Sequence, residues 1–321
     1  MTKAPVALTC GEPSGIGPEI AAKAWGALRE TVPILWIGDP SHIPAGIPIR
    51  EVRSADEAVQ VSATALPVLP HAFARTATPG VPDLANAQGV IDVIARGVEL
   101  VRSGAASALC TAPIHKKVLI DGADFAYPGH TEYLEALTGA PRAVMMLASE
   151  RLRVVPTTIH IALEDVSHVL TPELLRETIM ITAQSLRDHF KIVAPRLVVA
   201  GLNPHAGEGG AMGHQEGDWI AALVAEMAAE GLDVTGPWPG DTLFHAAARA
   251  RYDVAVCMYH DQALIPIKTL DFDKGVNVTL GLPIVRTSPD HGTAFDIAGR
   301  DIANPTSMIE AIKLAAKMAS S

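Results

Sequence analysis

The amino-acid sequence predicts an α/β protein built around a mostly parallel sheet. Short apolar runs typical of buried strands alternate with amphipathic helical segments along the whole chain, which is the pattern of such a sheet. Of the 321 residues, 49% are hydrophobic, so the chain can bury a large core. This length allows either two domains or one large α/β unit, and composition marks no linker between them.

Apolar runs predict the strands, and capping residues predict the clearest helix ends. Thr171 should be the N-cap of a helix over 172–190, with Pro172 at its first position, and Gly231 should end a helix over 219–230. The predicted strands are Val6–Cys10, Ile34–Ile37, Ala106–Thr111, Val154–Ile161, Arg196–Ala200, Val254–Met258 and Val276–Thr279.

Charge and hydropathy exclude several classes of partner. The formal net charge is −10 and no cluster of lysine and arginine occurs, which argues against a nucleic-acid surface. The N-terminal apolar run is too short for a signal peptide, and no stretch approaches the roughly 18 apolar residues of a membrane span. We therefore expect a cytoplasmic protein without membrane contact. Its three cysteines lie in or beside strand-like runs, where they should be small buried hydrophobic residues.

The stretch GEPSGIGPEI, from Gly11 to Ile20, stands between the first predicted strand and a helix. It lacks the third glycine of the dinucleotide fingerprint, and no Gly-Lys-Ser/Thr follows as in a P-loop. The favoured interpretation is a tight strand-to-helix turn with Pro18 starting the helix.

Three histidines follow apolar strands: His160 in RVVPTTIHIAL, His205 in RLVVAGLNPHAGEGG and His260 in VAVCMYHDQ. The carboxyl ends of parallel strands line one crevice, so the three imidazoles could converge. Three neutral nitrogens suit zinc or another late transition metal and leave a position open for a substrate oxygen. The alternative is that each is a hydrogen-bonded residue at the rim of the core. No HExxH motif is present, which argues against a zincin protease.

Charged residues surround these histidines in the sequence. Asp241 and Asp261 could accept the second ring N–H of ligating histidines, or could instead cap helices. His130 and Thr131 open a predicted helix whose N-terminus favours an anion. The other cations are Lys268 and Arg286, which could bind an anion, and Lys116 and Lys117, which should form a solvated helix face.

Six stretches resemble the 4-hydroxythreonine-4-phosphate dehydrogenase family of vitamin B6 biosynthesis, and the resemblance runs from Gly11 to about Asn304. They are, in order, GEPSGIGPEI, TAPIHKK, YPGHTEYL, GLNPHAGEGG, YHDQALIPIK and VNVTLGLPIVRTSPDHGTAFDIAG. The family fold is similar to isocitrate and isopropylmalate dehydrogenases, with two αβα subdomains and an active site in the interdomain cleft at a dimer interface. This implies an NAD-binding subdomain over 1–127 and 265–321, and a metal-binding, substrate-binding and dimerisation subdomain over 128–264.

The resemblance also implies a role for individual residues. His160, His205 and His260 would bind a divalent metal shared by two subunits of a homodimer, with zinc favoured and cobalt, magnesium or manganese as alternatives. Asp241 and Asp261 would maintain the site, and Lys268 or a hydroxide on the metal would be the general base. Substrate would contact His130, Thr131, Lys268, Asn277 and Arg286. NAD, or NADP, would contact His291, Gly292, Thr293, Ala294, Asp296, Ile297, Ala298, Gly299 and Asn304.

The implied reaction is NAD-dependent oxidation of 4-phosphooxy-L-threonine to 2-amino-3-oxo-4-phosphooxybutanoate, which loses carbon dioxide to give 3-amino-2-oxopropyl phosphate. Relatives with the same motifs oxidise 4-phosphothreonate or 4-phosphoerythronate, and another branch oxidises aromatic cis-dihydrodiols. Lys268 and Arg286 favour a phosphorylated substrate. A metal-dependent hydrolase and a non-catalytic phosphate-binding module are the alternatives from other classes, and the HGTAFDIAG stretch argues against both.

Overall fold

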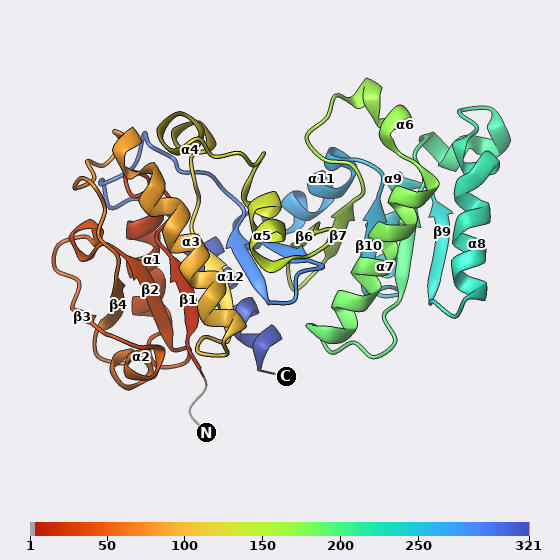
Figure 1. Cartoon of the computed structure of the whole chain (residues 1–321). Helices are drawn as coiled ribbons and strands as arrows, with labels where there is room; N and C mark the ends of the chain where they lie inside the picture. Colours follow the sequence, from red (N-terminus) through yellow and green to blue (C-terminus); the bar gives the residue numbers. More distant parts are fainter. Residues whose placement is uncertain (1–3, 321) are drawn as a thin grey trace. The chain divides into compact units, whose positions relative to one another are not determined.

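The computed structural model describes residues 4–320, which separate into two compact units (Figure 1). Within these residues, unit 1 consists of 4–142 and 282–320, and unit 2 consists of 143–281. The predicted α/β class is therefore confirmed, and unit 1 is made of two separate stretches of the chain.

The boundaries of the two units differ from those of the predicted subdomains, which were 1–127 with 265–321 and 128–264. Residues 1–3 and 321 of these ranges lie outside the described part of the chain. Helix α5 (His130–Thr138) falls in unit 1 because Tyr133 donates a hydrogen bond to the Ile91 carbonyl of helix α3 (Ala87–Arg102). Helix α11 (His260–Asp271) continues the core of unit 2, where Ile267 is fully buried. The roles assigned to the two subdomains stay predictions.

Unit 1 is built on a parallel sheet with the strand order β3-β4-β2-β1-β5-β12. Its strands are β1 (Val6–Thr9), β2 (Ile34–Gly38), β3 (Ile49–Glu51), β4 (Leu66–Pro70), β5 (Ala108–Thr111) and β12 (Arg286–Pro289). Every residue of β1, β2 and β5 is buried, as expected for central strands covered on both faces.

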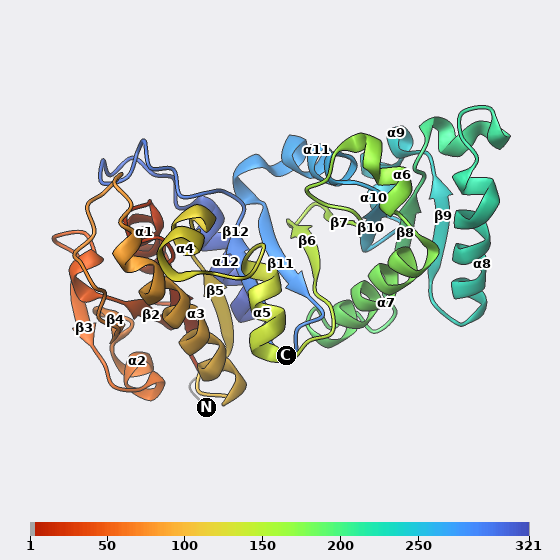
Figure 2. The same cartoon turned by 45° about the horizontal axis from the view of Figure 1, so that its top comes forward.

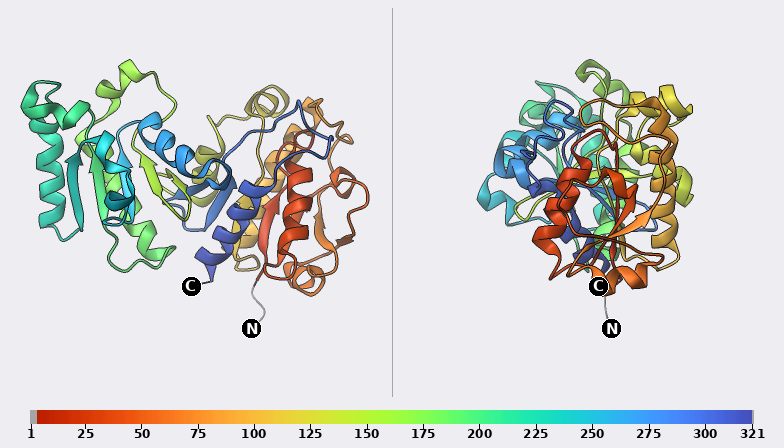
Figure 3. Two further views of the ribbon diagram at one scale, coloured as in Figure 1. Left: turned by 180° about the vertical axis from the view of Figure 1, so that it is seen from behind. Right: turned by 90° about the vertical axis from the view of Figure 1, so that its left-hand side faces the viewer.

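Helices cover both faces of the unit 1 sheet. Helix α1 (Gly17–Leu28) and helix α12 (Thr306–Ala319) pack on one face, and α3 packs with α5 on the other (Figures 1 and 3). The remaining helices of this unit are η1 (Pro40–His42), α2 (Ala55–Val61), η2 (Leu84–Asn86) and α4 (Lys116–Ala123).

Unit 2 contains a mixed sheet with the order β11-β6-β7-β10-β8-β9. Its strands are β6 (Val144–Ala148), β7 (Arg153–Pro156), β8 (Leu197–Ala200), β9 (Val234–Trp238), β10 (Val254–Cys257) and β11 (Val276–Leu280). Strand β6 runs antiparallel to both β11 and β7, whereas β7, β10, β8 and β9 pair in parallel. The antiparallel edge was not expected, because the sequence analysis did not identify the VMMLA run as a strand.

Helix α7 (Pro172–Asp188) covers one face of the unit 2 sheet and α11 the other (Figures 1 and 3). The Thr171 hydroxyl accepts a hydrogen bond from Leu174 N, so the predicted N-cap is confirmed. The predicted helix over 219–230 is divided, because a π-helical turn, η5 (Glu216–Ile220), precedes α8 (Ala221–Ala229). The shorter helices are η3 (Leu163–Asp165), α6 (Val166–Val169), η4 (Pro204–Gly210), α9 (Gly240–Leu243), α10 (Ala246–Arg249) and η6 (Phe272–Lys274). Across residues 4–320, no helix combines the length and apolar character that a membrane crossing requires.

Candidate active site

The three histidines follow three neighbouring parallel strands of unit 2. Strand β10 lies between β7 and β8 (Figure 2). In the sequence, His260 follows β10, His160 follows β7 and His205 follows β8. All three therefore belong to the same edge of the sheet. His260 begins α11, but β7 ends at Pro156, so His160 lies in an irregular segment where the sequence predicted a strand.

His160 and His260 form a pair of imidazoles. Their ring centroids lie 5.7 Å apart and the rings are tilted by 43°. Two imidazoles bound to one ion have centroids roughly 5 to 6 Å apart, because each metal–nitrogen bond is about 2.0 to 2.1 Å long. The separation of the two rings therefore matches that of two imidazole ligands of one ion. Over residues 4–320, no group of three or more His, Cys, Asp or Glu is arranged to hold a metal within one chain.

His205 lines the adjoining cavity of about 450 Å³ together with Asp241 and Asp261, and does not join the His160–His260 pair. Asp261 also lines a cavity of about 300 Å³ with His160 and His260. The shared aspartate places the two cavities side by side. The three predicted metal ligands therefore lie at one surface of unit 2, with His160 and His260 in one cavity and His205 in the adjoining one.

Backbone strain marks both loop histidines. His160 has φ +53° and His205 has φ +51°, in the left-handed region that non-glycine residues seldom adopt. The loop around His205 is held by the buried carboxylate of Glu216, which accepts hydrogen bonds from Asn203 N at 2.7 Å and Asn203 Nδ2 at 2.9 Å. A buried acceptor therefore stabilises a conformation that fixes the position of His205.

Gln262 joins the ends of the two strands that precede His205 and His260. Its Oε1 accepts a hydrogen bond from Met258 N at 2.7 Å, and its Nε2 donates to the Gly201 carbonyl at 2.7 Å. These contacts fix the start of α11 against the end of β8, which holds the two histidine segments in a defined relation.

Asp261 sets the tautomer of His260. Its Oδ1 lies 2.7 Å from His260 Nδ1, so a neutral imidazole carries its proton on Nδ1 and keeps the Nε2 lone pair for a metal. The alternative that Asp241 and Asp261 cap helices is wrong, because the N-cap positions of α9 and α11 belong to Pro239 and Tyr259.

Lys268 and Asn277 also belong to unit 2 but lie away from the histidine pair. Lys268 is in the last turn of α11, about 12 Å along the helix axis from His260 at 1.5 Å per residue. Its Nζ lies 5.6 Å from the ring centroid of Phe272. Asn277 is half-buried in β11, opposite Leu147. Within one chain, these two residues and the histidine pair do not form a single compact group.

Unit 1 contains a buried cationic cluster at the N-terminus of α5. Arg286 begins β12, is 3% exposed and donates from Nη2 to Thr111 Oγ1 at 2.6 Å. Burial lowers the pKa of Arg286 to about 10. His130, with Thr131 beside it, begins α5, and its Nε2 is buried without a hydrogen-bond partner. Anion-binding groups and a helix N-terminus therefore meet at one place.

Lys116 adds a further cation to this cluster, a role that the sequence did not predict for it. Lys116 and Lys117 are both exposed on α4, as expected, and Lys117 pairs with Asp121. A Cβ added to Gly129 would lie 3.2 Å from Lys116 Nζ, so the ammonium group is beside the N-cap of α5. The signal was the position of Lys116 just after β5, whose last residue Thr111 binds Arg286.

His130 should make stability depend on pH. Burial, and then the nearby charges of Arg286 and Lys116, hold its pKa well below 6.5. At pH values between the folded and the unfolded pKa, the unfolded chain binds more protons than the folded chain. The contribution of His130 to the free energy of unfolding is therefore fully present above about pH 6.5. It decreases as the pH is lowered, by at most about 1.4 kcal/mol per pH unit. His42, whose pKa burial also lowers, contributes with the same sign.

We therefore expect His130→Asn to flatten the pH dependence of the free energy of unfolding between pH 7 and 5. Urea titrations at each pH measure that slope for the variant and for wild type. Because His42 is present in both proteins, the difference reports His130 alone. Parallel slopes would show that His130 is not held neutral in the native protein.

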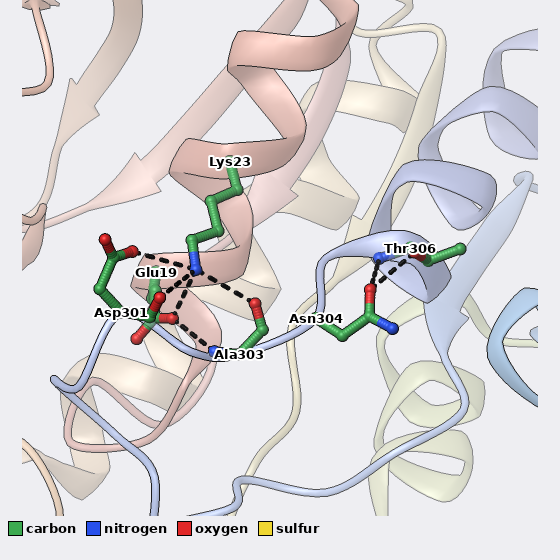
Figure 4. Close-up of polar contacts among 6 residues, drawn as sticks. All are labelled: Glu19, Lys23, Asp301, Ala303, Asn304 and Thr306. Carbon is green, nitrogen blue, oxygen red and sulfur yellow. Dashed lines mark hydrogen bonds and ion pairs between the residues drawn. The ribbon is translucent and has the colours of Figure 1, made fainter.

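The predicted cofactor residues lie in unit 1 between β12 and α12. The Thr293 carbonyl accepts a hydrogen bond from Ile16 N at 3.0 Å. Asn304 is exposed, and its Oδ1 accepts from Thr306 N at 3.0 Å and Thr306 Oγ1 at 2.6 Å (Figure 4). Two donors therefore fix the oxygen side of the Asn304 amide and leave Nδ2 directed away from Thr306 (Figure 4).

Comparison with known proteins gives one consistent family. Residues 29–315 match the model of the pyridoxal phosphate biosynthetic protein PdxA. The chain is 68% identical over 317 residues to the 4-hydroxythreonine-4-phosphate dehydrogenase of Roseobacter denitrificans, covering 98% of this chain and 97% of the relative.

Two solved structures show the same fold. The 4-hydroxythreonine-4-phosphate dehydrogenase of Klebsiella pneumoniae superposes with a TM-score of 0.90 at 37% identity over 99% of both chains. A terephthalate 1,2-cis-dihydrodiol dehydrogenase of Burkholderia xenovorans superposes with a TM-score of 0.68 at 27% identity over 98% of both chains.

Proposed function

Because the chain belongs to the family of the pyridoxal phosphate biosynthetic protein PdxA, we propose that it oxidises 4-phosphooxy-L-threonine with NAD as the electron acceptor. The hydroxyl-bearing carbon gives up a hydride and the hydroxyl group a proton, which yields 2-amino-3-oxo-4-phosphooxybutanoate and NADH. This β-keto acid then loses carbon dioxide to give 3-amino-2-oxopropyl phosphate. NADP is the alternative acceptor.

The observation that carries this substrate is the cationic cluster of unit 1, in which Arg286 is buried and Lys116 is exposed. Arg286 is 3% exposed, and its positive charge, with that of Lys116, acts on His130 at the start of α5. A phosphate monoester matches such a cluster because guanidinium and backbone N–H groups bind its oxygens with charge-assisted hydrogen bonds. A terephthalate cis-dihydrodiol offers only carboxylates, which carry one charge each, whereas a phosphate monoester carries up to two charges and three acceptor oxygens. Thr131, Lys268 and Asn277 would complete the substrate contacts.

We assign the metal-binding role to His160 and His260 of one chain and His205 of a second copy. The 5.7 Å separation of the first two rings supports this division, because His205 stands in the adjoining cavity. The surface beside the pair exposes Ile161 and Leu163, at 39% and 71%, as an interface between copies would require. A bound divalent cation, zinc by preference and cobalt, magnesium or manganese otherwise, would supply Lewis-acid polarisation of the substrate oxygen.

The chain's own side chains would orient the reactants and exchange protons. Asp261 keeps the proton of His260 on Nδ1, and Asp241 stands in the same cavity as His205. Lys268 is the side chain of this set that we assign to take the hydroxyl proton. Arg286 and Lys116 would hold the phosphate, which is carried by the carbon next to the reacting one, so that binding energy orients the substrate.

Absorbance at 340 nm tests the reaction directly. With NAD present, the purified protein should reduce it on addition of 4-phosphooxy-L-threonine, and more slowly with 4-phosphothreonate or 4-phosphoerythronate. A cis-dihydrodiol should give no signal. If the protein preferred 4-phosphothreonate or 4-phosphoerythronate, that acid would replace 4-phosphooxy-L-threonine as the assigned substrate. If it preferred the dihydrodiol, the role assigned to the cationic cluster would be rejected. Release of phosphate without NADH would indicate a hydrolase.

A further inference from the structure

A lysine on α1 holds the end of the predicted cofactor segment. Lys23 Nζ donates hydrogen bonds to the backbone carbonyls of Asp301 at 3.0 Å and Ala303 at 3.2 Å (Figure 4). The same ammonium group contacts Glu19 Oε1 at 2.9 Å and Asp301 Oδ1 at 3.0 Å. The Asp301 carboxylate is 88% exposed, so the contacts to the two carbonyls and to Glu19 are the ones that fix the segment.

Glu19 holds the same stretch of backbone from its other side. Its Oε1 accepts a hydrogen bond from Ala303 N at 2.8 Å, and Glu19 is 6% exposed. Lys23 therefore binds the C=O of Ala303 and Glu19 binds its N–H (Figure 4). The two side chains stand one helical turn apart and pair with each other, so together they define one position for this residue.

Ala303 is bonded directly to Asn304, whose amide orientation is already fixed by Thr306. The Asn304 Nδ2 can donate to a ring nitrogen of adenine, which is an acceptor. A shift of the Ala303 peptide would move this donor by a similar amount, and hydrogen bonds weaken steeply with distance and angle.

The opposite end of the segment is held by the same motif. Ile16 N donates to the Thr293 carbonyl at 3.0 Å, and a Cβ on Gly15 would lie 2.8 Å from that carbonyl oxygen. GEPSGIGPEI, interpreted from sequence as a simple turn, thus contacts both ends of the cofactor segment.

We propose that Glu19 and Lys23 are positioning residues that set the affinity for the adenine half of the dinucleotide, through Ala303 and Asn304. This inference rests on the proposed function, because it takes the segment 291–304 as the cofactor site. We assign Glu19 and Lys23 no contact with the substrate, because their hydrogen bonds go to each other, to Asp301 and to Ala303.

The test compares Lys23→Met, which keeps the length of the side chain, with Lys23→Arg and the control Lys117→Met. Lys117 also pairs with an acidic residue four positions along a helix, and it lies outside the site. We expect Lys23→Met to weaken NADH and ADP-ribose binding about 5- to 30-fold, measured by fluorescence titration and competition. The KM for the phosphorylated substrate and kcat at saturating NAD should not change. Lys23→Arg should recover most of the affinity, and Lys117→Met should match wild type.

Coupling to Asn304 separates positioning from a general loss of structure. In an Asn304→Ala background, Lys23→Met should cause less than about a 2-fold further loss, because the donor that it positions is gone. The inference would be overturned if wild type and Lys23→Met bound NADH with equal affinity. It would also be overturned if Lys23→Met reduced the NADH affinity as much in the Asn304→Ala background as in wild type. Either result would leave the proposed function intact. If wild type binds neither NADH nor ADP-ribose, the cofactor site and the inference both fail.

Discussion

An equimolar, randomly reassembled mixture of His160→Ala and His205→Ala chains should regain about a quarter of wild-type activity, although each variant alone should lose at least roughly 100-fold in kcat/KM. A shared site places the damage of both chains in one of the two sites of a mixed dimer and leaves the other site intact. Random reassembly makes about half of the dimers mixed, and half of their sites work.

The structure also predicts which pair should not recover. His160 and His260 lie 5.7 Å apart in one chain, so we assign both to the same site. A mixed dimer of His160→Ala with His260→Ala then has one damaged ligand in each of its two sites. His205→Ala should complement either variant, whereas His160→Ala and His260→Ala should not complement each other.

Co-expression of each pair with two affinity tags isolates the mixed dimers, in which one site of two should work, so the isolated complementing dimers should show about half of wild-type activity. His245, exposed on unit 2 and outside the cavities described above, supplies a control. A mixture of His160→Ala with His245→Ala should keep about half of the activity, because only one kind of chain is damaged. If subunit exchange is verified and no histidine pair recovers, the shared metal site must be withdrawn.

The order of strands explains why the histidine set was accessible to sequence reasoning but its division was not. Each histidine follows an apolar run, and parallel strands end at one edge, so the placement of all three at one edge of the sheet follows from local patterns. The sequence does not reveal that β10 lies between β7 and β8, or that His160 leaves the strand at Pro156 and adopts φ +53°. These depend on long-range pairing and on contacts such as Gln262 with Gly201.

Lys116 and β6 show a second limit of sequence reasoning. Lys116 and Lys117 are neighbouring lysines at the start of α4. Lys117 pairs with Asp121 one helical turn later, whereas Lys116 lies near Gly129. Strand β6 lies in a short apolar run without alternation, which periodicity alone cannot distinguish from a buried helix. The contact of Lys116 with the Gly129 region and the pairing of β6 with β11 both depend on residues farther along the chain.

Arg286→Met should lower kcat/KM for the phosphorylated substrate by about 10- to 150-fold, mainly through KM, because charge-assisted hydrogen bonds contribute about 1.5 to 3 kcal/mol. The unliganded variant should stay within about 1 kcal/mol of wild type. Replacement of a buried charge by an apolar side chain of similar size removes a desolvation penalty, which offsets the lost hydrogen bond to Thr111.

The burial of Arg286 makes these two effects separable. Its pKa is lowered to about 10 by burial, so the charged form is less stable there than in water, and an anion would relieve that cost. Inorganic phosphate should therefore raise the melting temperature of wild type and of the control variant Arg96→Met. Arg96 is a half-buried arginine of α3 that donates a hydrogen bond to the Pro70 carbonyl. Arg286→Met should show little or no rise. If phosphate stabilises Arg286→Met as much as wild type, with an unchanged KM, the buried guanidinium is a structural residue and the phosphate must bind elsewhere.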